Sequence, residues 1–256
     1  MPPLPTLMVA PNGARRTKAD HPALPVTIPE IVATAKACFE AGADGLHAHV
    51  RDGDQRHVLD AGLYRELLSE LSAQVPDLAV QITTEAVGQY SPPEQRAVVR
   101  EVMPKAVSVA LSEMLSDGDE PAARDFYHWA GEAGIAVQHI LYAPEDVSRF
   151  FESQARSLIP VGTPQLLFVL GRYAVNQESS PADLAPYLKA LKQPADWAVC
   201  AFGQGETDCL LAAHKAGGKM RIGFENSLWR ADGSVAESNE QRVADLGLQL
   251  TAQHPS

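Results

Sequence analysis

The stretch "GLHAHVRDGD", residues 45–54, places two histidines one residue apart in a run that otherwise has the composition of a buried strand. Because successive side chains of a strand point to opposite faces, Leu46, Ala48 and Val50 share one face, and His47 and His49 share the other. An aliphatic face of this kind packs against helices in an α/β protein, so the pattern predicts an internal strand of a parallel sheet. The histidine face requires a separate explanation.

Short β-branched runs alternate with amphipathic stretches along the whole chain. The predicted strands are Leu7–Ala10, Gly45–Val50, Ala79–Thr83, Ala106–Ala110, Ile135–Ile140, Gln165–Val169, Trp197–Ala201 and Met220–Gly223. Predicted helices begin near Pro29, Ala61, Pro92, Pro121, Pro144, Pro181, Thr207 and Ser238. Eight strands, each followed by a helix, predict a single (β/α)8 TIM-barrel domain over residues 1–256.

An open, doubly wound sheet built from the same elements is the alternative fold. The glycine fingerprint with which such sheets bind dinucleotides is absent after the first strand, where residues 10–20 read "APNGARRTKAD". The barrel is therefore favoured. It predicts that functional side chains lie at the carboxyl ends of the strands and in the loops that follow them.

The composition argues against several classes of protein. Of the 256 residues, 45% are hydrophobic and 21% are charged, and the formal net charge of −11 argues against nucleic-acid and anionic-membrane partners. No apolar run approaches the roughly 20 residues of a membrane span, and the first residues lack the pattern of a signal peptide, so we expect a cytoplasmic protein. Cys38, Cys200 and Cys209 are too scattered for a disulfide framework or a Cys-x-x-Cys metal site.

A carboxylate at the end of the eighth strand is predicted to join the two histidines. In "MRIGFENSLW", residues 220–229, Glu225 shares the inward face with Arg221. Strand eight closes onto strand one, whose other neighbour is strand two, so Glu225 can reach His47 and His49. Two nitrogens and one oxygen with an open fourth position form a catalytic zinc site. Two structural histidines beside a salt-bridged carboxylate are the alternative.

Other polar side chains are predicted on the inward face of the third and fourth strands. In "AVQITTEAVG", residues 79–88, these are Gln81, Thr83 and Glu85, and in "AVSVALSE", residues 106–113, it is Ser108. Small hydroxyls beside a metal suit the recognition of a polar substrate. Each of them alone is also typical of an ordinary strand-end cap.

Four other histidines are expected to lie outside the site. His57, His128, His214 and His254 fall in predicted loops, helices or the tail, where a solvated surface position is expected. The phase of the fifth strand leaves open whether His139, in "AVQHILY", residues 136–142, faces the barrel interior.

Five segments together resemble the β-keto acid cleavage enzymes, in order and over nearly the whole chain. They are "VAPNGARRTKADHPALPVTIPEI" (residues 9–31), "HAHVRD" (47–52), "QITTEAVG" (81–88), "FVLG" (168–171) and "RIGFENSLWRADGSVAESN" (221–239). The resemblance implies a zinc-dependent TIM-barrel enzyme, usually a homotetramer. In this family a β-keto acid reacts with acetyl-CoA to give acetoacetate and the CoA thioester of the remaining fragment.

The resemblance also implies roles for particular residues. The family's metal ligands fall on His47, His49 and Glu225, its arginine for the substrate carboxylate on Arg221, and its hydroxyl contacts on Thr83 and Ser108. Zinc acts as a Lewis acid toward a carbonyl group, and the planar fork of an arginine matches a carboxylate. A salt bridge at the barrel rim is the alternative role for Arg221.

One departure from the family lies in the loop after the first strand, "NGARR", residues 12–16. Arg15 stands where the type that cleaves 3-keto-5-aminohexanoate carries an acidic residue associated with binding the substrate amine. An arginine repels an ammonium group and favours an anionic or polar one. We therefore expect the same reaction class on a different substrate, with Asn12, Gly13 and Arg15 in contact with it.

A second departure follows the metal-binding glutamate. Asn226 stands where that type has an aspartate, so one candidate acid or base is lost. Glu85, at a position where that type tends to have glycine, is a possible substitute. The predicted catalytic residues are accordingly Arg221, Glu85 and Asn226.

Two other functions remain as alternatives. A zinc amidohydrolase also uses a His-x-His pair in a barrel, but on the first strand and with further histidines later, whereas here strand six ends in "FVLGRY", residues 168–173. A non-catalytic metal- or ligand-binding module is the other alternative. An open coordination position beside an arginine and hydroxyls argues for catalysis, and turnover with acetyl-CoA discriminates the two.

Overall fold

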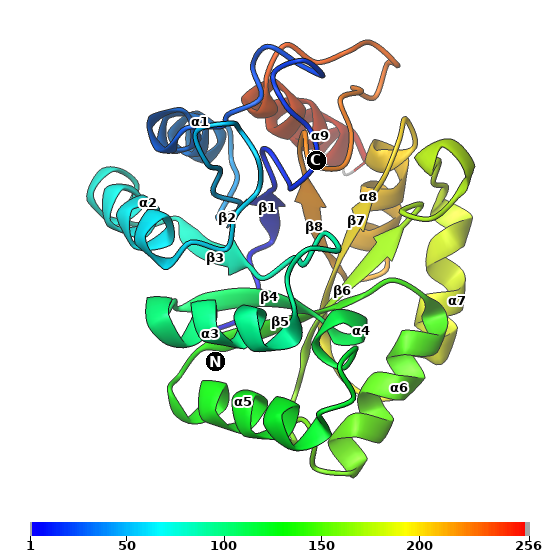
Figure 1. Ribbon diagram of the computed structural model, residues 1–256. Helices are drawn as coiled ribbons and strands as arrows, with labels where there is room; N and C mark the ends of the chain where they lie inside the picture. Colours follow the sequence, from blue (N-terminus) through cyan, green and yellow to red (C-terminus); the bar gives the residue numbers. More distant parts are fainter. Residues whose placement is uncertain (1, 254–256) are drawn as a thin grey trace.

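Eight parallel strands close into a barrel in the computed structural model, which describes residues 2–253 (Figure 1). They are β1 (Leu7–Val9), β2 (Gly45–Ala48), β3 (Ala79–Thr83), β4 (Ala106–Ala110), β5 (Ala136–Leu141), β6 (Gln165–Leu170), β7 (Asp196–Ala201) and β8 (Lys219–Ile222). Each strand pairs with the next in sequence, and β8 pairs with β1. This closure confirms the TIM barrel and excludes the open sheet.

Helices surround the barrel (Figure 1). They are α1 (Ile28–Glu40), α2 (Ala61–Gln74), α3 (Pro92–Val102), α4 (Leu111–Met114), α5 (Glu120–Glu132), α6 (Pro144–Ala155), α7 (Leu184–Ala190), α8 (Glu206–Lys215) and α9 (Asn239–Gln253). The one-turn helix α4 was not expected. The helix predicted from Pro181 begins as a 3-10 turn over Pro181–Asp183 and continues as α7. Within the described residues, no helix is both long and apolar enough to cross a membrane.

The start of α1 follows from its sequence. Thr27 is the N-cap and accepts a hydrogen bond from the Glu30 N–H, while the Glu30 carboxylate accepts from the N–H groups of Thr27 and Val26, both at 3.0 Å. Burial opposes ionisation of Glu30, but hydrogen bonds from Lys18, Thr27 and Val26 outweigh it and lower the pKa to about 2. This cap fixes where the loop between β1 and α1 ends, and that loop lines the site described below.

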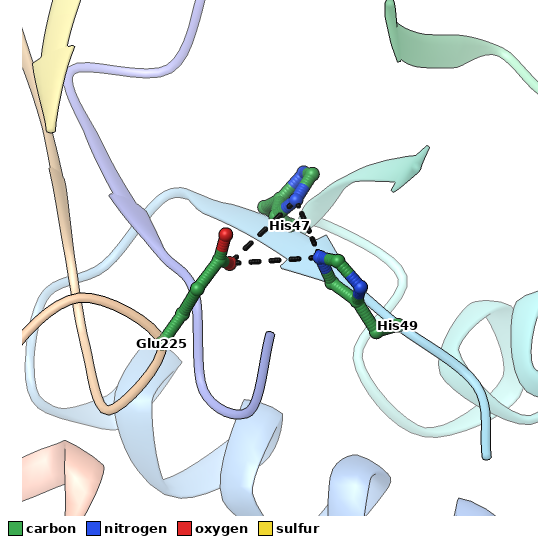
Figure 2. A group of neighbouring side chains, drawn as sticks. All are labelled: His47, His49 and Glu225. Carbon is green, nitrogen blue, oxygen red and sulfur yellow. Dashed lines mark hydrogen bonds and ion pairs between the residues drawn. The ribbon is translucent and has the colours of Figure 1, made fainter. Parts of the chain in front are cut away.

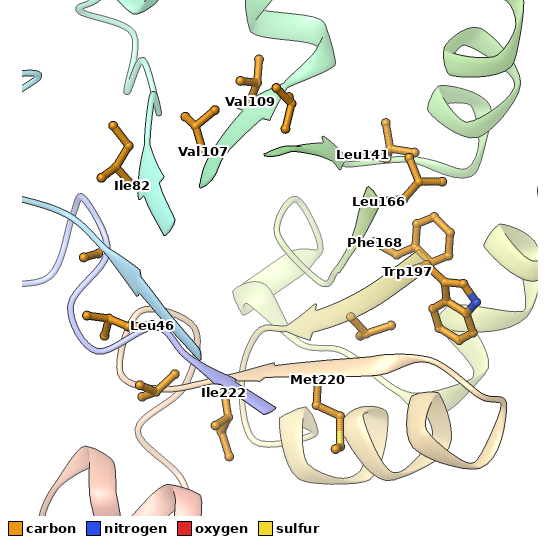
Figure 3. Packing of buried hydrophobic residues seen from close by; sticks show 14 of the residues in the cluster. Leu46, Ile82, Val107, Val109, Leu141, Leu166, Phe168, Trp197, Met220 and Ile222 are labelled. Carbon is orange, nitrogen blue, oxygen red and sulfur yellow. The ribbon is translucent and has the colours of Figure 1, made fainter. Parts of the chain in front are cut away.

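Apolar side chains form two layers. Leu46, Ile82 and Phe168 belong to the larger layer, between the strands and the helices (Figure 3). The opposite faces of β4 to β7 form a smaller cluster inside the barrel, which includes Leu167 and Cys200. Because the aliphatic face of β2 is used in the outer layer, its histidine face is directed inward, as the alternation predicts.

The prediction carried the second strand to Val50, but β2 ends at Ala48. The chain turns back after this point: Arg51 forms an antiparallel bridge with His57, and the Val58 N–H donates to the Val50 carbonyl at 3.3 Å. His49 therefore lies just beyond the strand, on a segment that is held by its own return loop.

Candidate metal centre and active site

His47 lies on β2, His49 directly follows it, and Glu225 lies in the loop after β8 (Figure 2). The structure brings these three side chains together, with one donor atom of each within 4.8 Å of the others. His47 Nε2 is 3.1 Å from His49 Nε2, and Glu225 Oε2 is 3.7 Å from both nitrogens. Both imidazoles are buried.

A chain of hydrogen bonds determines which nitrogen of His47 carries the proton. Gln138 Nε2 donates to the backbone carbonyl of Leu166 at 3.5 Å, so Gln138 Oε1 accepts from Gln81 Nε2 at 3.1 Å. Gln81 Oε1 then accepts from His47 Nδ1 at 2.9 Å. A neutral imidazole protonated on Nδ1 presents a lone pair at Nε2, which faces His49 and Glu225.

The same reasoning applies to His49 through His57. His57 Nε2 donates to the backbone carbonyl of Glu85 at 2.9 Å, so its Nδ1 is an acceptor, and it lies 3.4 Å from His49 Nδ1. His49 is thus protonated on Nδ1 and presents a lone pair at Nε2. The prediction of a solvated His57 was wrong: the side chain is buried, and burial lowers its pKa to about 4.

This group fits a divalent cation. Burial lowers the pKa of His47 and His49 well below the usual range, so both rings are neutral. Two lone pairs then face each other and Glu225 Oε2, which has no hydrogen-bond partner among the described residues. Three converging donors without a proton between them repel one another unless a cation joins them. Two imidazole nitrogens and a carboxylate oxygen are a donor set of zinc sites.

Arg221, on β8, holds the other oxygen of this carboxylate. Its Nη2 donates to Glu225 Oε1 at 3.0 Å, which turns Glu225 Oε2 toward the histidines. Arg221 is 4% exposed, yet Nε and Nη1 have no partner among the described residues. Although burial opposes it, the negative charge of Glu225 raises the pKa of Arg221. A charged guanidinium with two unpartnered nitrogens can bind an anion next to the group formed by His47, His49 and Glu225 (the metal group).

Glu85, after β3, is a second carboxylate beside this group. Its Oε2 is 3.9 Å from His49 Nε2, and its Oε1 is 3.5 Å from Arg172 Nη2. Burial and the nearby charge of Glu225 raise the pKa of Glu85 to about 7. Sequence reasoning missed Arg172, whose guanidinium also lies 5.1 Å from the centre of the Phe202 ring.

A cavity of about 40 Å³ lies beside the metal group. The predicted site residues on its wall are Arg15, His47, Thr83, Glu85, Arg221, Glu225 and Asn226. The backbone N–H of Glu85 donates to Thr83 Oγ1 at 3.0 Å, and the Asn226 side chain has no hydrogen-bond partner in the described chain. Arg15 is exposed.

Three predicted substrate contacts lie behind this wall. Asn12 donates to the backbone carbonyls of Pro25 and His49, at 3.1 and 2.9 Å. Gly13 has a left-handed φ of +60°, and a Cβ there would lie 2.5 Å from Glu225 Cγ, so both residues support the metal group. Ser108 is buried without a hydrogen-bond partner for its hydroxyl in the described part of the chain.

The remaining histidines lie away from this cavity. The ring of His139 packs against Tyr127 of α5 and Phe150 of α6, so it faces the helices. His128 and His214 are partly exposed, in line with the surface prediction. His254 lies outside the described residues.

Buried polar side chains hold the loop that carries Glu225. Arg242, on α9, forms an ion pair with Glu206, and both side chains are 1% exposed. Arg242 Nη1 also donates to Ser227 Oγ at 3.1 Å, and Arg16 Nη1 donates to the Phe224 carbonyl at 2.6 Å. The Phe224 N–H donates to Asn239 Oδ1 at 2.9 Å. These contacts fix the backbone on both sides of Glu225.

Comparisons with curated proteins find distant relatives that align over most of the chain. A 3-keto-5-aminohexanoate cleavage enzyme from Fusobacterium nucleatum subsp. nucleatum is 26% identical over 238 residues, which cover 90% of this chain and 85% of the relative. A 3-oxoadipate:acetyl-CoA acetyltransferase from Cupriavidus necator is 26% identical over 257 residues, covering 94% and 86%.

Comparisons with solved structures support the fold. The apo structure of ObcA matches with a TM-score of 0.70 at 15% identity, covering 91% of this chain and 62% of that chain. A type I 3-dehydroquinate dehydratase from Clostridium difficile matches with a TM-score of 0.63 at 15% identity, covering 97% and 93%.

A model of one protein family matches residues 6–251, nearly the whole chain. Its description is beta-keto acid cleavage enzyme. The match favours carbon–carbon cleavage over the amidohydrolase and the non-catalytic module. This chain belongs to the beta-keto acid cleavage enzyme family.

Proposed function

We propose that this protein cleaves a β-keto acid with acetyl-CoA and uses zinc bound by His47, His49 and Glu225. The C2–C3 bond of the keto acid breaks, its C1–C2 unit joins the acetyl group to form acetoacetate, and the remaining acyl group leaves as a CoA thioester. The arrangement that carries the proposal is the unpartnered Glu225 Oε2 facing two imidazole lone pairs. Zinc supplies Lewis acidity toward a keto oxygen when it is bound.

We propose that Arg221 binds the carboxylate of the substrate. Its Nε and Nη1 are buried without partners, while Nη2 is already used by Glu225. A carboxylate that accepts from Nη1 lies beside the metal group, so the C3 carbonyl of the same substrate comes next to the Glu225 side chain. Arg221 thereby orients the bond that breaks.

We propose that Glu85 removes the proton from C2 of the substrate. Asn226 lines the same cavity, but an amide cannot accept this proton as a carboxylate does. The described cavity wall carries two carboxylates, those of Glu85 and Glu225. Glu225 is a proposed metal ligand, so Glu85 is the carboxylate that remains to accept the proton. Its ion pair with Arg172 holds the side chain on the cavity side of β3. Thr83, on the cavity wall, is proposed as a hydroxyl contact of the substrate, whereas Ser108, Asn12 and Gly13 are proposed to support the site from behind that wall.

Arg15 determines the proposed preference for the distal group of the substrate. It is exposed at the wall of the cavity, so solvent screens its charge. Two unit charges 4 Å apart interact by about 1 kcal/mol in water, which is roughly fivefold in kcat/KM. We expect kcat/KM to be higher by about this factor for a neutral distal group than for an ammonium group, and higher again by about the same factor for an anionic group.

The proposed function is tested by supplying the purified protein with zinc, acetyl-CoA and three keto acids. The 3-oxoadipate, 3-oxohexanoate and 3-keto-5-aminohexanoate molecules differ in the charge of the distal group. We expect acetoacetate to form only when acetyl-CoA is present, and kcat/KM to be higher for 3-oxoadipate and 3-oxohexanoate than for 3-keto-5-aminohexanoate. Formation of no acetoacetate from any of them contradicts the reaction class, and a preference for the amino substrate contradicts the role of Arg15.

The oligomeric state is a separate proposal. A homotetramer follows from the resemblance to the family, and the exposed apolar side chains of Tyr173 and Leu248, 78% and 69% exposed, are surfaces that such an assembly could cover. Light scattering of the purified protein measures the mass directly, and the mass of a monomer contradicts the proposal.

A further inference from the structure

Glu85 and Arg172 form an ion pair across the mouth of the barrel. Each lies two residues after the carboxyl end of a strand, Glu85 after β3 and Arg172 after β6, and β4 and β5 separate these strands. Glu85 Oε1 is 3.5 Å from Arg172 Nη2, and the two side chains are 14% and 13% exposed. Both line the active-site cavity. The pair therefore joins two sides of the cavity whose strands do not pair with each other.

The Glu85 carboxylate lies almost as close to His49 as the proposed ligand Glu225 does. Glu85 Oε2 is 3.9 Å from His49 Nε2, and Glu225 Oε2 is 3.7 Å from the same nitrogen. Glu85 is nevertheless not one of the three residues whose donor atoms all lie within 4.8 Å of one another. It stands at the edge of the metal group, and rotation about the bonds of its side chain can bring the carboxylate into the group.

Arg172 is the residue that holds this carboxylate where it is. The backbone of Glu85 is fixed by two hydrogen bonds, one to Thr83 Oγ1 at 3.0 Å and one from His57 Nε2 at 2.9 Å. No described residue donates a hydrogen bond to the carboxylate itself, so its position depends on the ion pair with Arg172. Arg172 is supported in turn by Phe202, whose ring centre is 5.1 Å from the guanidinium carbon.

Two positive charges compete for this mostly buried carboxylate. A carboxylate removed from water needs a cation beside it. The guanidinium of Arg172 is one, and a metal ion bound to the metal group would be the other. Two nitrogens and one oxygen leave one position of a catalytic zinc site open. If Glu85 filled this position, a substrate carbonyl could not bind there, and Glu85 could not accept the proton from C2.

We propose that Arg172 is a positioning residue that keeps the Glu85 carboxylate out of the metal group. This inference rests on the proposed function, because it requires a metal ion at His47, His49 and Glu225. While Arg172 binds Glu85, the open position stays available to the substrate and the carboxylate stays available as a base. Without Arg172, Glu85 becomes a fourth ligand.

The affinity for zinc tests this proposal without depending on turnover. The Kd of the purified protein for zinc is measured by competition with a chelator. Methionine keeps an apolar contact with Phe202 and removes the charge, so Arg172→Met should bind zinc roughly 10-fold more tightly, the smaller of the changes that neighbours of metal ligands usually cause. Arg172→Lys keeps the charge and should bind zinc as the native protein does.

Glu85→Gln supplies the matched background. Removing the positive charge of Arg172 favours a cation at any nearby site. This general effect is all that remains in Glu85→Gln, because a neutral amide replaces the competing carboxylate. We expect Arg172→Met to tighten zinc binding far less in this background than in the native one.

Cobalt(II) in place of zinc gives a second measurement, because its visible absorption depends on the number of ligands. Sodium azide should change the spectrum of the cobalt-loaded native protein by binding at the open position, and should leave that of Arg172→Met unchanged. A native Kd for zinc in Arg172→Met, or equal tightening in both backgrounds, overturns the role of Arg172 even if the protein cleaves β-keto acids. A native protein that binds no zinc overturns the proposed set of ligands as well.

Discussion

Replacing Arg242 by methionine removes one partner of an ion pair that lies behind the loop carrying Glu225. Arg242 and Glu206 are each 1% exposed, so water cannot take the place of the guanidinium. The variant keeps most of the apolar stem of the side chain and leaves the Glu206 carboxylate buried without its cation. It also removes the hydrogen bond from Arg242 to Ser227, two residues after Glu225.

The expected loss of stability follows from this burial. Breaking a buried pair by removing one partner costs about 3–5 kcal/mol, because the remaining charge is uncompensated. For a chain of this size each kcal/mol shifts the melting temperature by roughly 2–4 °C, so Arg242→Met should melt roughly 6–20 °C below the native protein. Because Ser227 loses its anchor, we also expect zinc to bind more weakly to the folded variant.

Two matched variants test the reasoning. Arg156 and Glu120 form an exposed ion pair, with side chains 61% and 42% exposed, and Arg156→Met should cost less than about 1 kcal/mol. Adding Glu206→Gln to Arg242→Met removes the stranded charge and should recover part of the loss. Urea denaturation gives the three free energies. If Arg242→Met costs no more than Arg156→Met, or if the second substitution restores nothing, the buried charge is not the cause.

Three further predictions concern the metal, the substrate and acid stability. Metal analysis of the purified protein should give about one zinc per chain. The His47→Ala variant should lose this zinc, and the control variant His128→Ala should keep it. Zinc retained by His47→Ala contradicts the proposed set of ligands. Arg221→Lys should keep the metal, raise KM and lower kcat, because a lysine lacks the planar fork; native kinetics would make Arg221 a rim residue. The pKa of Glu30 is lowered to about 2, so the native protein should be more stable than Glu30→Gln above about pH 5 and should lose this advantage as the pH falls toward 2. Because the Glu30 side chain is 39% exposed, we expect the two free energies of unfolding, measured by urea denaturation, to differ by roughly 1 kcal/mol above pH 5. A difference that grows in acid contradicts the sign of the predicted effect.

Much of the fold could be predicted because each strand carries its own local signal. The alternation in residues 45–50 predicts both the strand and the direction of its histidines, and the structure places Leu46 and Ala48 in the outer layer as expected. The end of β2 could not be read from this pattern. It depends on the return of the chain through the Asp52–Asp54 turn, which pairs Arg51 with His57.

The candidate metal group could be predicted because barrel closure places strand eight next to strand one. His57 was missed, although "DGD" before it is a turn signal that brings residue 57 back toward residue 51. Arg172 and Arg242 had no such signal. Their partners, Glu85 and Glu206, become known only from the packing of separate loops and helices.

The position of β1 between the two halves of the metal group has a consequence for how the chain matures. β1 is three residues long, pairs with β2 on one side and with β8 on the other, and contributes none of the three donors. A nascent chain that has produced only β2 has two of the three proposed ligands, so we expect a metal ion to bind firmly only after β8 has been synthesised and has docked. A metal ion bound by the three proposed ligands would then link the segments that follow β2 and β8, on either side of β1, and by mass action it would stabilise the closed ring by about 4 kcal/mol at a thousandfold excess over its Kd. Zinc uptake during synthesis would therefore report the completion of the barrel.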